Sequence, residues 1–438
     1  MMSHNQMIND ASLETLASNP SCMDDYDPNA MSVAKARSFI RQFLSPITNT
    51  ETLPLRASLG RVLAADILSP SNVPNYDNSA MDGYAFNADD IEADKLTALK
   101  VIGTAFAGNA FTGEIKHGEC VRMMTGAMMP KGADTVVVQE NIALENGSIT
   151  FTKAPKRAMN VRYAGEDLQQ GQTVLAAGHL IRAADLGLIA SLGISNLSVY
   201  CKLKVAFFST GDELAGVGEV LKTGQVYDSN RYTLYGMLSR LGVEIMDLGA
   251  ISDDPKLLET TLLAAVSQAD VIISSGGVSV GEADYMKQLL AEHGQVVFWK
   301  IAMKPGRPLA YGKIQGSNSK QAHYFGLPGN PVAVMVTFYQ FVREALLVLM
   351  GQPCPAPLPM FNVVCTEPIK KMTGRTEFQR GILFADYAGL WKVKPTGAQG
   401  SAILSSMSCA NCFIVLDEAV ANLEAGAVVQ VQVLDGLV

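Results

Sequence analysis

The stretch ADVIISSGGVSVGEADY, residues 269–285, decides the fold of this chain. An apolar strand runs directly into a glycine pair and then into the start of an amphipathic helix, which is the layout of a βα turn in a parallel sheet. Glycines let the backbone approach a ligand closely, and free N–H groups at a helix start favour an anion. We therefore expect Gly276, Gly277, Ser279 and Gly281 to bind an anionic group, with an ordinary tight turn as the alternative.

Strand and helix patterns alternate on both sides of this stretch, between about residues 200 and 352. The expected strands are KVAFFS (204–209), VEIMDLG (243–249) and ADVIISS (269–275). The expected helices are SNRYTLYGMLSRLG (229–242), DPKLLETTLLAAVSQ (254–268) and EADYMKQLLAEHG (282–294). Such alternation predicts a doubly wound α/β domain, in which helices cover both faces of a parallel sheet and ligands bind at the carboxyl ends of its strands.

The rest of the chain predicts further domains, because 438 residues are too many for one ordinary core. Residues 31–44 are expected to form an amphipathic helix with Ser32 as its cap. Short β-rich pieces between about 96 and 152 indicate a small all-β domain. After a Pro-rich linker at 352–359, strands return without a convincing helix, which predicts a small β-barrel or sandwich. The expected fold class is multidomain α/β plus β.

Composition argues against several classes of protein. The net charge of −8 disfavours generic nucleic-acid binding. The polar residues 1–30 lack the regions of a secretory signal, and we identify no apolar run approaching the ~20 residues of a membrane span. Seven cysteines without framework spacing fit a reducing cytoplasm, and the CxxC of Cys409 and Cys412 is interpreted as barrel core. We expect a soluble, cytoplasmic protein that binds neither nucleic acid nor membrane.

Three cations fall close together in FWKIAMKPGRPLAYG, residues 298–312. Lys300, Lys304 and Arg307 stand among apolar residues, and cations fixed beside apolar surface bind phosphate through charge-assisted hydrogen bonds. Any one of them alone would be interpreted as a solvated side chain. Together with the rigid turn at 326–331, GLPGNP, they predict an anion-binding cleft.

Acidic side chains are expected at the same edge of the sheet. Asp212 and Glu213 follow one predicted strand, and Asp284 begins a predicted helix. Because Mg²⁺ takes one or two carboxylates plus substrate phosphate, Glu213 and Asp284 are the first candidates for a Mg²⁺ site. Asp228 and Asp253 are interpreted first as helix caps.

A serine hydrolase is a weaker alternative for this cleft. Residues 277–281 spell G-x-S-x-G, the pattern of a nucleophile elbow. That mechanism needs a downstream histidine, and neither His293 nor His323 is well placed. Glu282 and Asp284 would also oppose the charge that an oxyanion hole must stabilise. The sequence holds no GxxxxGK[ST], so a P-loop nucleotidase is disfavoured.

Several motifs, taken in order, carry a resemblance to a known family. They are VPNYDNSAMDGYA (73–85), RMMTGAMMP (122–130), NVRYAGED (160–167), FSTGDEL (208–214), SSGGVSVGEADY (274–285), KIAMKPGRP (300–308) and GLPGNPV (326–332). Over residues 31–438 they closely resemble the MoeA family, the molybdopterin molybdenumtransferases. The resemblance implies a flexible tail at 1–30, an elongated mixed domain I from 31–75 and 165–199, a β-rich domain II at 76–164, the α/β molybdopterin-binding domain III at 200–352, and a β-barrel domain IV at 353–438.

The resemblance also implies a reaction, in which molybdenum from molybdate is inserted into adenylylated molybdopterin with Mg²⁺-dependent release of AMP. The catalytic residues that it implies are Glu213, Asp284, Asp82, Lys300 and Lys304. The substrate-binding residues that it implies are Gly276, Gly277, Ser279, Gly281, Arg307, Thr125, Arg162, Asp167, Asp253, Pro328, Pro331 and Ser401. It further implies a homodimer, in which Asp82 and Thr125 complete the cleft of the partner subunit.

Two other functions remain as alternatives. The adenylylation step that precedes insertion uses a related fold, but because one α/β unit of this kind is present, a separate adenylyltransferase is the expected partner. A non-enzymatic scaffold is the other alternative, because this architecture also occurs in gephyrin.

Overall fold

The computed structural model describes residues 30–91, 96–151, 153, 155–277, 283–316 and 320–434. The chain divides into two compact units. The first comprises Met1–Glu51, Gly60–Val62 and Tyr200–Val438, and the second comprises Thr52–Leu59 and Leu63–Val199.

The first unit contains a six-stranded sheet with the strand order β16-β13-β17-β21-β20-β18. Its strands are β13 (Lys204–Thr210), β16 (Glu244–Ile251), β17 (Val271–Ser275), β18 (Gly294–Lys300), β20 (Pro308–Gln315) and β21 (Gln321–Leu327). β16, β13, β17 and β21 run parallel, as predicted, whereas β20 is antiparallel to β21 and to β18. The three strands expected from the sequence are among the parallel ones, and β20 and β18 extend the sheet with antiparallel pairing that was not expected, because the short connection between β20 and β21 allows antiparallel pairing alone.

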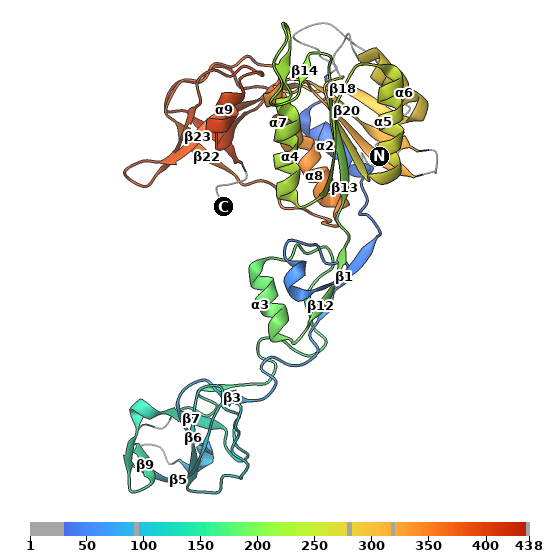
Figure 1. Cartoon of the computed structure of the whole chain (residues 1–438). Coiled ribbons are helices and arrows are strands. Elements are labelled where there is room, and N and C mark those ends of the chain that lie inside the picture. The colour runs from blue at the N-terminus through green and yellow to red at the C-terminus, as the bar shows by residue number, and fades with distance from the viewer. Residues whose placement is uncertain are drawn as a thin grey trace, which may run out of the picture. The chain divides into compact units, whose positions relative to one another are not determined.

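Helices cover both faces of this sheet, as predicted (Figure 1). One face carries α4 (Ser229–Leu241), α7 (Pro331–Thr337), η4 (Phe338–Val342) and α8 (Arg343–Leu349), and the other carries α5 (Pro255–Gln268) and α6 (Ala283–His293). Side chains along β13 alternate between the two faces. Phe207 is buried in the same core as Leu234 of α4, whereas Phe208 is buried with Leu258 of α5.

The helical segment Pro331–Leu349 differs from the sequence-based expectation. At 19 residues it is long and apolar enough to cross a membrane by length and composition alone, so the statement that no apolar run approaches that length is wrong. In the structure, 78% of its apolar window is buried. A helix that is hydrophobic all round is typical of the core of a large domain. Here that core contains Val332, Val336, Phe341 and Leu346.

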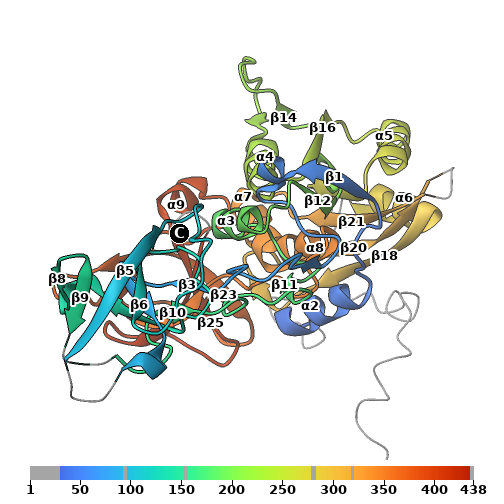
Figure 2. The ribbon, with the colours of Figure 1, turned by 90° about the horizontal axis from the view of Figure 1, so that it is seen from below.

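Helix α2 (Val33–Gln42) confirms the predicted N-terminal helix. Its cap is Ser32, whose side chain accepts a hydrogen bond from Lys35 N. The helix packs against η4, and the rings of Phe39 and Trp299 meet edge to face, 5.0 Å apart. Figure 2 shows α2 beside the α/β part, whose core it joins. The resemblance assigned this helix to domain I, but its apolar stripe covers the α/β core. The other domain boundaries stay predictions.

The C-terminal part of the first unit is a closed β-barrel. Its strands are β22 (Met360–Cys365), β23 (Thr376–Ala385), β24 (Trp391–Pro395), β25 (Cys412–Leu416) and β26 (Val428–Val433). They follow the order β23-β24-β22-β26-β25, and pairing of β25 with β23 closes the ring. The short helix α9 (Leu404–Cys409) was not expected. Cys412 is barrel core, as interpreted, but Cys409 is exposed at the end of α9, which corrects that half of the interpretation.

The second unit contains the predicted β-rich domain, a curled sheet of order β7-β4-β6-β5-β9-β8. Its strands are β4 (Gly83–Phe86), β5 (Thr97–Ala105), β6 (Glu119–Met123), β7 (Thr135–Val138), β8 (Ala143–Glu145) and β9 (Ser148–Phe151). A mixed part is built from two separated stretches, in which β1 (Thr50–Pro54) pairs with β12 (Asn196–Tyr200) and β2 (Ile67–Leu68) with β11 (Thr173–Leu175), beside α3 (Ala183–Ser191).

Candidate active site

Three parallel strands end level with one another and place their following loops at one edge of the sheet. Ser209 of β13 pairs with Ser275 of β17, which in turn pairs with Leu327 of β21. The segments after these strands, at 211–213, 276–277 and 328–331, therefore begin side by side. This is the carboxyl edge at which the sequence predicted a ligand site.

The three predicted cations lie on a turn at the same edge. β18 runs antiparallel to β20, and their pairing closes with Lys300 opposite Pro308. Ala310 of β20 pairs with Gly326, close to the end of β21, so residues 300–308 form a turn at the carboxyl edge. Ile301 N donates to Arg307 O at 2.7 Å, which holds the turn closed.

The glycine turn after β17 is closely packed. Gly276 and Gly277 have φ of +92° and +66°, backbone conformations that side-chain-bearing residues rarely adopt. A Cβ on Gly276 would lie 2.6 Å from Thr210 O, and Gly276 N donates to Leu327 O at 3.1 Å. A Cβ on Gly329 would lie 3.8 Å from Gly276 Cα, so the GLPGNP turn lies beside the glycine turn.

Part of the predicted loop falls outside the described residues. Ser279 and Gly281 are in this part, and so is the side chain of Asp284. The backbone of Asp284 belongs to the first turn of α6.

The acidic residues of the edge divide into ligand candidates and caps. Glu213 is exposed, and its carboxylate folds back over Gly211. Asp228 is the N-cap of α4, as interpreted, but the cap of α5 is Asp254 and not Asp253. Asp253 N instead donates to Asp212 Oδ1 at 3.2 Å, so the two loops that carry these aspartates are joined.

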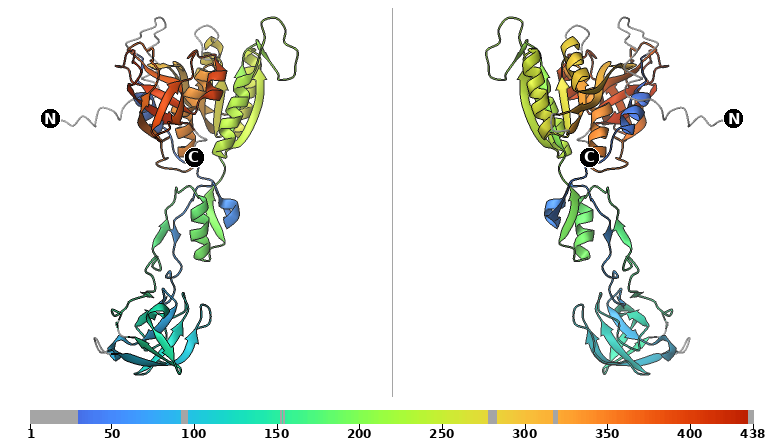
Figure 3. Two further views of the ribbon diagram at one scale, coloured as in Figure 1. Left: turned by 90° about the vertical axis from the view of Figure 1, so that its left-hand side faces the viewer. Right: turned by 90° about the vertical axis from the view of Figure 1, so that its right-hand side faces the viewer.

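The loop that follows Glu213 extends outward. It connects β14 (Leu214–Ala215) with β15 (Val226–Tyr227) and protrudes from the first unit (Figure 3). Val226 N donates to Glu213 O at 2.9 Å, so the base of the loop holds the backbone of Glu213 in place.

The barrel supplies a buried carboxylate to the cation turn. β19 (Met303–Lys304) pairs in parallel with β23, which places Lys304 opposite Glu377. The Glu377 side chain is 4% exposed, and its Oε1 lies 4.0 Å from Lys304 Nζ and 3.9 Å from Arg375 Nε. The sequence-based analysis missed Glu377 and Arg375, because the pairing that brings them to the turn spans more than seventy residues of chain.

Arg380 is a third site residue that no local sequence pattern indicates. It is 1% exposed and has no carboxylate partner among the residues that the structure describes. Burial lowers the pKa of Arg380 to about 10, so the guanidinium stays charged at neutral pH. Its Nη2 donates to Ala398 O at 3.3 Å and Gly400 O at 3.0 Å, which fixes the loop before Ser401. Ser401 O in turn accepts from Val332 N, at the start of α7.

A cavity of about 410 Å³ lies where the cation turn meets the barrel, and Lys304, Lys370, Glu377 and Arg380 are among its lining residues. Three cations and two carboxylates are among its thirteen lining residues, and two of these ionic groups, Glu377 and Arg380, are buried. Such a cavity fits a small, strongly hydrated anion better than an apolar ligand.

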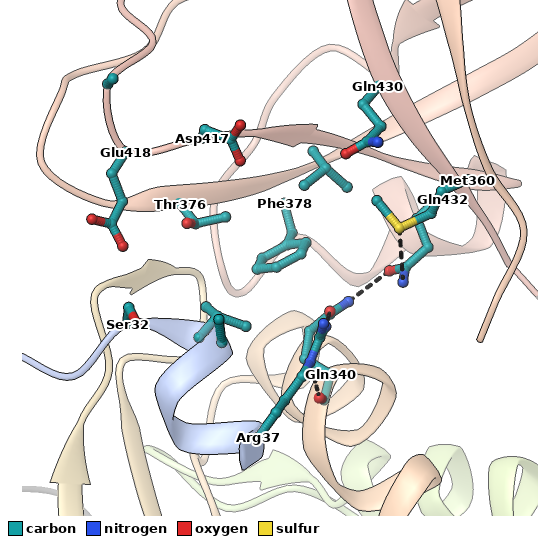
Figure 4. A pocket seen from close by; sticks show the side chains of 14 residues that line it. Ser32, Arg37, Gln340, Met360, Thr376, Phe378, Asp417, Glu418, Gln430 and Gln432 are labelled. Atoms are coloured by element: carbon teal, nitrogen blue, oxygen red, sulfur yellow. Dashed lines mark hydrogen bonds between the residues drawn. The ribbon is translucent and has the colours of Figure 1, made fainter. Parts of the chain in front are cut away.

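A second cavity, of about 510 Å³, lies between α2 and the barrel (Figure 4) and is lined by none of the predicted site residues. Asp417 and Glu418 line one side and Arg37 the other. Arg37 Nε donates to Gln340 O at 2.8 Å, and Gln340 Nε2 donates to Gln432 Oε1 at 2.7 Å. These bonds join the α/β part to the barrel, so this cavity belongs to their interface.

In the second unit, Asp82 and Thr125, both implied by the resemblance as cleft residues, are in contact with each other. Asp82 Oδ1 accepts from Thr125 N at 2.7 Å and from Thr125 Oγ1 at 2.8 Å. These two hydrogen bonds hold the pKa of Asp82 below its ordinary value, and the bond from the backbone N–H of Thr125 has the larger effect. Asp82 therefore stays ionised to lower pH than an ordinary aspartate.

Replacing Thr125 by Val should raise the pKa of Asp82 part of the way to its ordinary value, because the hydroxyl bond is lost while the backbone N–H remains. Since the folded-state pKa is the depressed one, the stabilisation from this pair is present above the unfolded-state pKa and is lost as pH falls through the folded-state value. Carboxyl-carbon NMR titration measures the change, with Asp134 of the same domain as an unchanged control. An identical Asp82 titration in both proteins would contradict this account.

Arg162 and Asp167 lie on the surface of the second unit. Arg162 is in β10 (Val161–Arg162), opposite Asn78, and Asp167 N donates to Val73 O at 3.0 Å. Both side chains are exposed, and the described residues include no ion pair of either one. Their roles in binding stay predictions.

The structure thus gathers most of the candidates into two groups. At the carboxyl edge of the sheet and the adjoining barrel it brings together Glu213, Asp253, Gly276, Gly277, Lys300, Lys304, Arg307, Pro328, Pro331 and Ser401. In the second unit, Asp82 and Thr125 are in contact, and Arg162 and Asp167 lie in the same unit.

Three family models match successive parts of the chain. The MoeA N-terminal region (domain I and II) matches residues 31–193, a probable molybdopterin binding domain matches 206–348, and the MoeA C-terminal region (domain IV) matches 362–434. Their order is the order expected from the motifs.

Individual relatives agree with these models. A protein of Haemophilus influenzae named molybdopterin molybdenumtransferase is 45% identical, over 92% of this chain and 98% of its own length. Gephyrin of Dictyostelium discoideum is 33% identical, over 92% of this chain and 62% of its own length. The crystal structure of the molybdopterin biosynthesis MoeA protein of Pyrococcus horikoshii has a TM-score of 0.79 and 28% identity, over 93% of this chain and 100% of that one. By these matches, the chain belongs to the MoeA family.

Proposed function

We propose that this protein is a molybdopterin molybdenumtransferase, which takes adenylylated molybdopterin and molybdate and releases AMP. The names of its relatives support the transfer itself. The observation that carries the proposal is the sheet edge that joins the glycine turn at 276–277, the cation turn at 300–308 and the exposed carboxylate of Glu213. A substrate with a phosphoanhydride needs donors for its oxygens, and this edge supplies backbone N–H groups and three cations.

Two anionic groups must be bound at once in this reaction, and the first unit offers two places for them. The glycine turn and its neighbouring loops fit the phosphoanhydride, because residues without side chains allow its oxygens to approach the backbone closely. The cavity at Lys304 and Arg380 fits molybdate, a compact oxyanion that takes charge-assisted hydrogen bonds. Lys304 lies on the cation turn and also lines this cavity, so it connects the two places.

Mg²⁺ fits the carboxylates of this edge. Within the described part of the chain, no group of three or more His, Cys, Asp or Glu side chains could hold a metal ion. Mg²⁺ needs fewer protein ligands than that, since it is commonly held by one or two carboxylates and the substrate phosphates. Glu213 and Asp284 would hold it, and the ion would neutralise charge on the phosphoanhydride oxygens.

Direct detection of the product tests the proposal. The purified protein is incubated with adenylylated molybdopterin, molybdate and Mg²⁺, and the pterin is isolated and assayed for molybdenum by mass spectrometry. We expect molybdenum to travel with the pterin, and chelation of Mg²⁺ by EDTA to prevent this until Mg²⁺ is restored. Pterin that remains free of molybdenum in the complete mixture would reject the proposal.

Replacing Arg380 by Met should lower the rate of molybdenum transfer per folded molecule at least about tenfold, because the guanidinium is expected to bind an anion and fixes the Ser401 loop. The change should also lower the free energy of unfolding by about 1–3 kcal/mol, because Ala398 O and Gly400 O lose their donor. Turnover and urea denaturation measure the two effects. Arg240→Met, which removes an exposed arginine in the last turn of α4, serves as the control. Normal turnover by the Arg380 variant would contradict this assignment.

We also propose a homodimer in which Asp82 and Thr125 complete the cleft of the partner subunit. Two inactive variants, Asp82→Ala and Glu213→Gln, should then restore activity when co-expressed, because half of the clefts in a mixed dimer contain neither change. The expected recovery is about a quarter of the wild-type rate. No recovery in mixed dimers verified by mass spectrometry would place both residues in one subunit's site.

The supply of substrate is assigned to a separate adenylyltransferase, because one probable molybdopterin binding domain is matched, at 206–348. The expected cytoplasmic location stays a prediction.

A further inference from the structure

We propose that Asn230 is a positioning residue, which ties the glycine turn at 276–277 to the GLPGNP turn at 326–331 so that both face the substrate in fixed register. The inference deepens the proposed function and depends on it for its kinetic test alone. Asn230 lies in the first turn of α4, on neither of the two turns that it joins.

The geometry of Asn230 connects three separate segments. Its side chain is buried, with the residue 9% exposed. Nδ2 lies 2.8 Å from Ser275 Oγ, at the last position of β17, and 2.6 Å from Gly329 O, in the GLPGNP turn. Ser275 directly precedes Gly276, so one amide group contacts both turns at their bases.

The direction of these hydrogen bonds follows from chemistry. A carbonyl oxygen can only accept, so the Asn230 nitrogen must be the atom that faces Gly329 O. Ser275 Oγ lies 3.5 Å from Pro328 O and can donate to it. The bonds then run from Asn230 to Ser275 and on to Pro328, and the second proton of the amide goes to Gly329. A carboxylate in place of the amide could not donate to Gly329.

The helix that presents Asn230 is itself anchored to the sheet. Asp228, the cap of α4, is 3% exposed, and its Oδ1 accepts from Ser209 Oγ at 3.0 Å and from Arg231 N at 3.2 Å. Ser209 is in β13, the strand beside β17. The start of α4 is therefore held against the ends of the strands. Asn230, which lies in this first turn of α4, holds both turns in place through its hydrogen bonds.

The position of the two turns must be fixed, because a small displacement of a group that binds the substrate lowers the reaction rate far more than it lowers the affinity. A shift of about 1 Å at a catalytic site can lower the rate by about a hundredfold. The pair of turns has one further backbone link among the bonds described here, from Gly276 N to Leu327 O. We expect loss of the Asn230 amide to loosen both turns and to lower kcat more than it raises KM.

The test compares three variants of the full-length protein. Asn230→Ala removes both bonds, whereas Asn230→Asp keeps the size of the side chain and can still accept from Ser275, but puts a carboxylate against Gly329 O. Asn411→Ala is the matched control, because the Asn411 side chain also makes two hydrogen bonds, in its case with Leu383 N and O in the barrel. The readouts are backbone hydrogen exchange of peptides covering 271–277 and 326–330, urea denaturation, and kcat and KM for adenylylated molybdopterin.

Both Asn230 variants should exchange at least about tenfold faster in the two peptides, and the Asn411 variant should not. Their kcat should fall about tenfold or more with KM changed less than threefold, whereas the control should keep the wild-type kcat per folded molecule. Unchanged exchange in both peptides overturns the inference, whether or not the wild type turns over. Wild-type behaviour of Asn230→Asp also overturns it, because size alone would then suffice. If the wild-type protein shows no turnover, the proposed function is rejected. The hydrogen-exchange measurement then still tests whether Asn230 holds the two turns.

Discussion

Glu213→Gln should lower the rate of molybdenum transfer about a hundredfold or more, with the free energy of unfolding unchanged. The side chain is exposed and accepts no hydrogen bond from the described core, so its removal does not disturb packing. Its carboxylate lies at the sheet edge where the phosphoanhydride is proposed to bind, and the amide of glutamine cannot replace its charge toward Mg²⁺. Single-turnover transfer of molybdenum at saturating Mg²⁺ measures the effect.

Glu219→Gln is the control for this prediction, because Glu219 is an exposed acid of the loop that follows β14. It should keep the wild-type rate. Asp284→Asn should show a loss as large as that of Glu213→Gln. If both variants turn over normally, these carboxylates do not hold the metal and the proposed arrangement of the cleft is wrong.

Gly276→Ala should remove activity and destabilise the fold as well. At φ of +92° a residue with a side chain is strained by about 1–3 kcal/mol, and the new Cβ would lie 2.6 Å from Thr210 O and 2.9 Å from Thr210 Oγ1. Thr210 O is a backbone atom, so the turn itself has to move away from β13. The displaced turn can no longer approach the substrate, and we expect turnover to fall at least about a hundredfold.

Gly249→Ala is the control for Gly276→Ala, because it introduces the same backbone strain without a steric clash. Gly249 has a φ of +83°, but a Cβ there meets nothing within 4 Å. Gly249→Ala should lower the free energy of unfolding measured by urea denaturation, and it should leave the rate of molybdenum transfer per folded molecule unchanged. Equal rates in the two alanine variants would show that the close approach at Gly276 is not needed for function.

The part of the fold that sequence could predict is the part set by local patterns. Strand β17 is a short, mostly apolar run that two glycines follow, and α4 has a capping aspartate before its first residue and Gly242, with φ of +75°, after its last. Each signal lies within a few residues of the element that it defines. The same signals placed the glycine turn and the three cations at one edge of the sheet, and the structure confirmed this.

The long helix at 331–349 could not be recognised by periodicity. It is buried on almost all sides, so its sequence has no polar face to reveal a repeat of 3.6 residues. The direction of β20 was missed for a related reason. A buried strand has the same apolar composition whether it runs parallel or antiparallel, and the connection to β21 alone sets its direction.

The residues that sequence reasoning missed in the site depend on long-range pairing. Glu377 and Arg380 belong to the barrel, and the parallel pairing of β19 with β23 brings that strand to the cation turn. Neither residue is part of a local pattern that indicates an anion site. A buried arginine without a carboxylate partner in the described part of the chain is the structural signal that could identify it.

The most direct test of the central claim is AMP release from adenylylated molybdopterin by the purified protein with Mg²⁺, measured with and without molybdate. We expect release that depends on molybdate and is lost in Glu213→Gln, because cleavage of the phosphoanhydride and insertion of molybdenum share one cleft. The absence of AMP release in the complete mixture would contradict this expectation and would leave a binding protein with the family's fold.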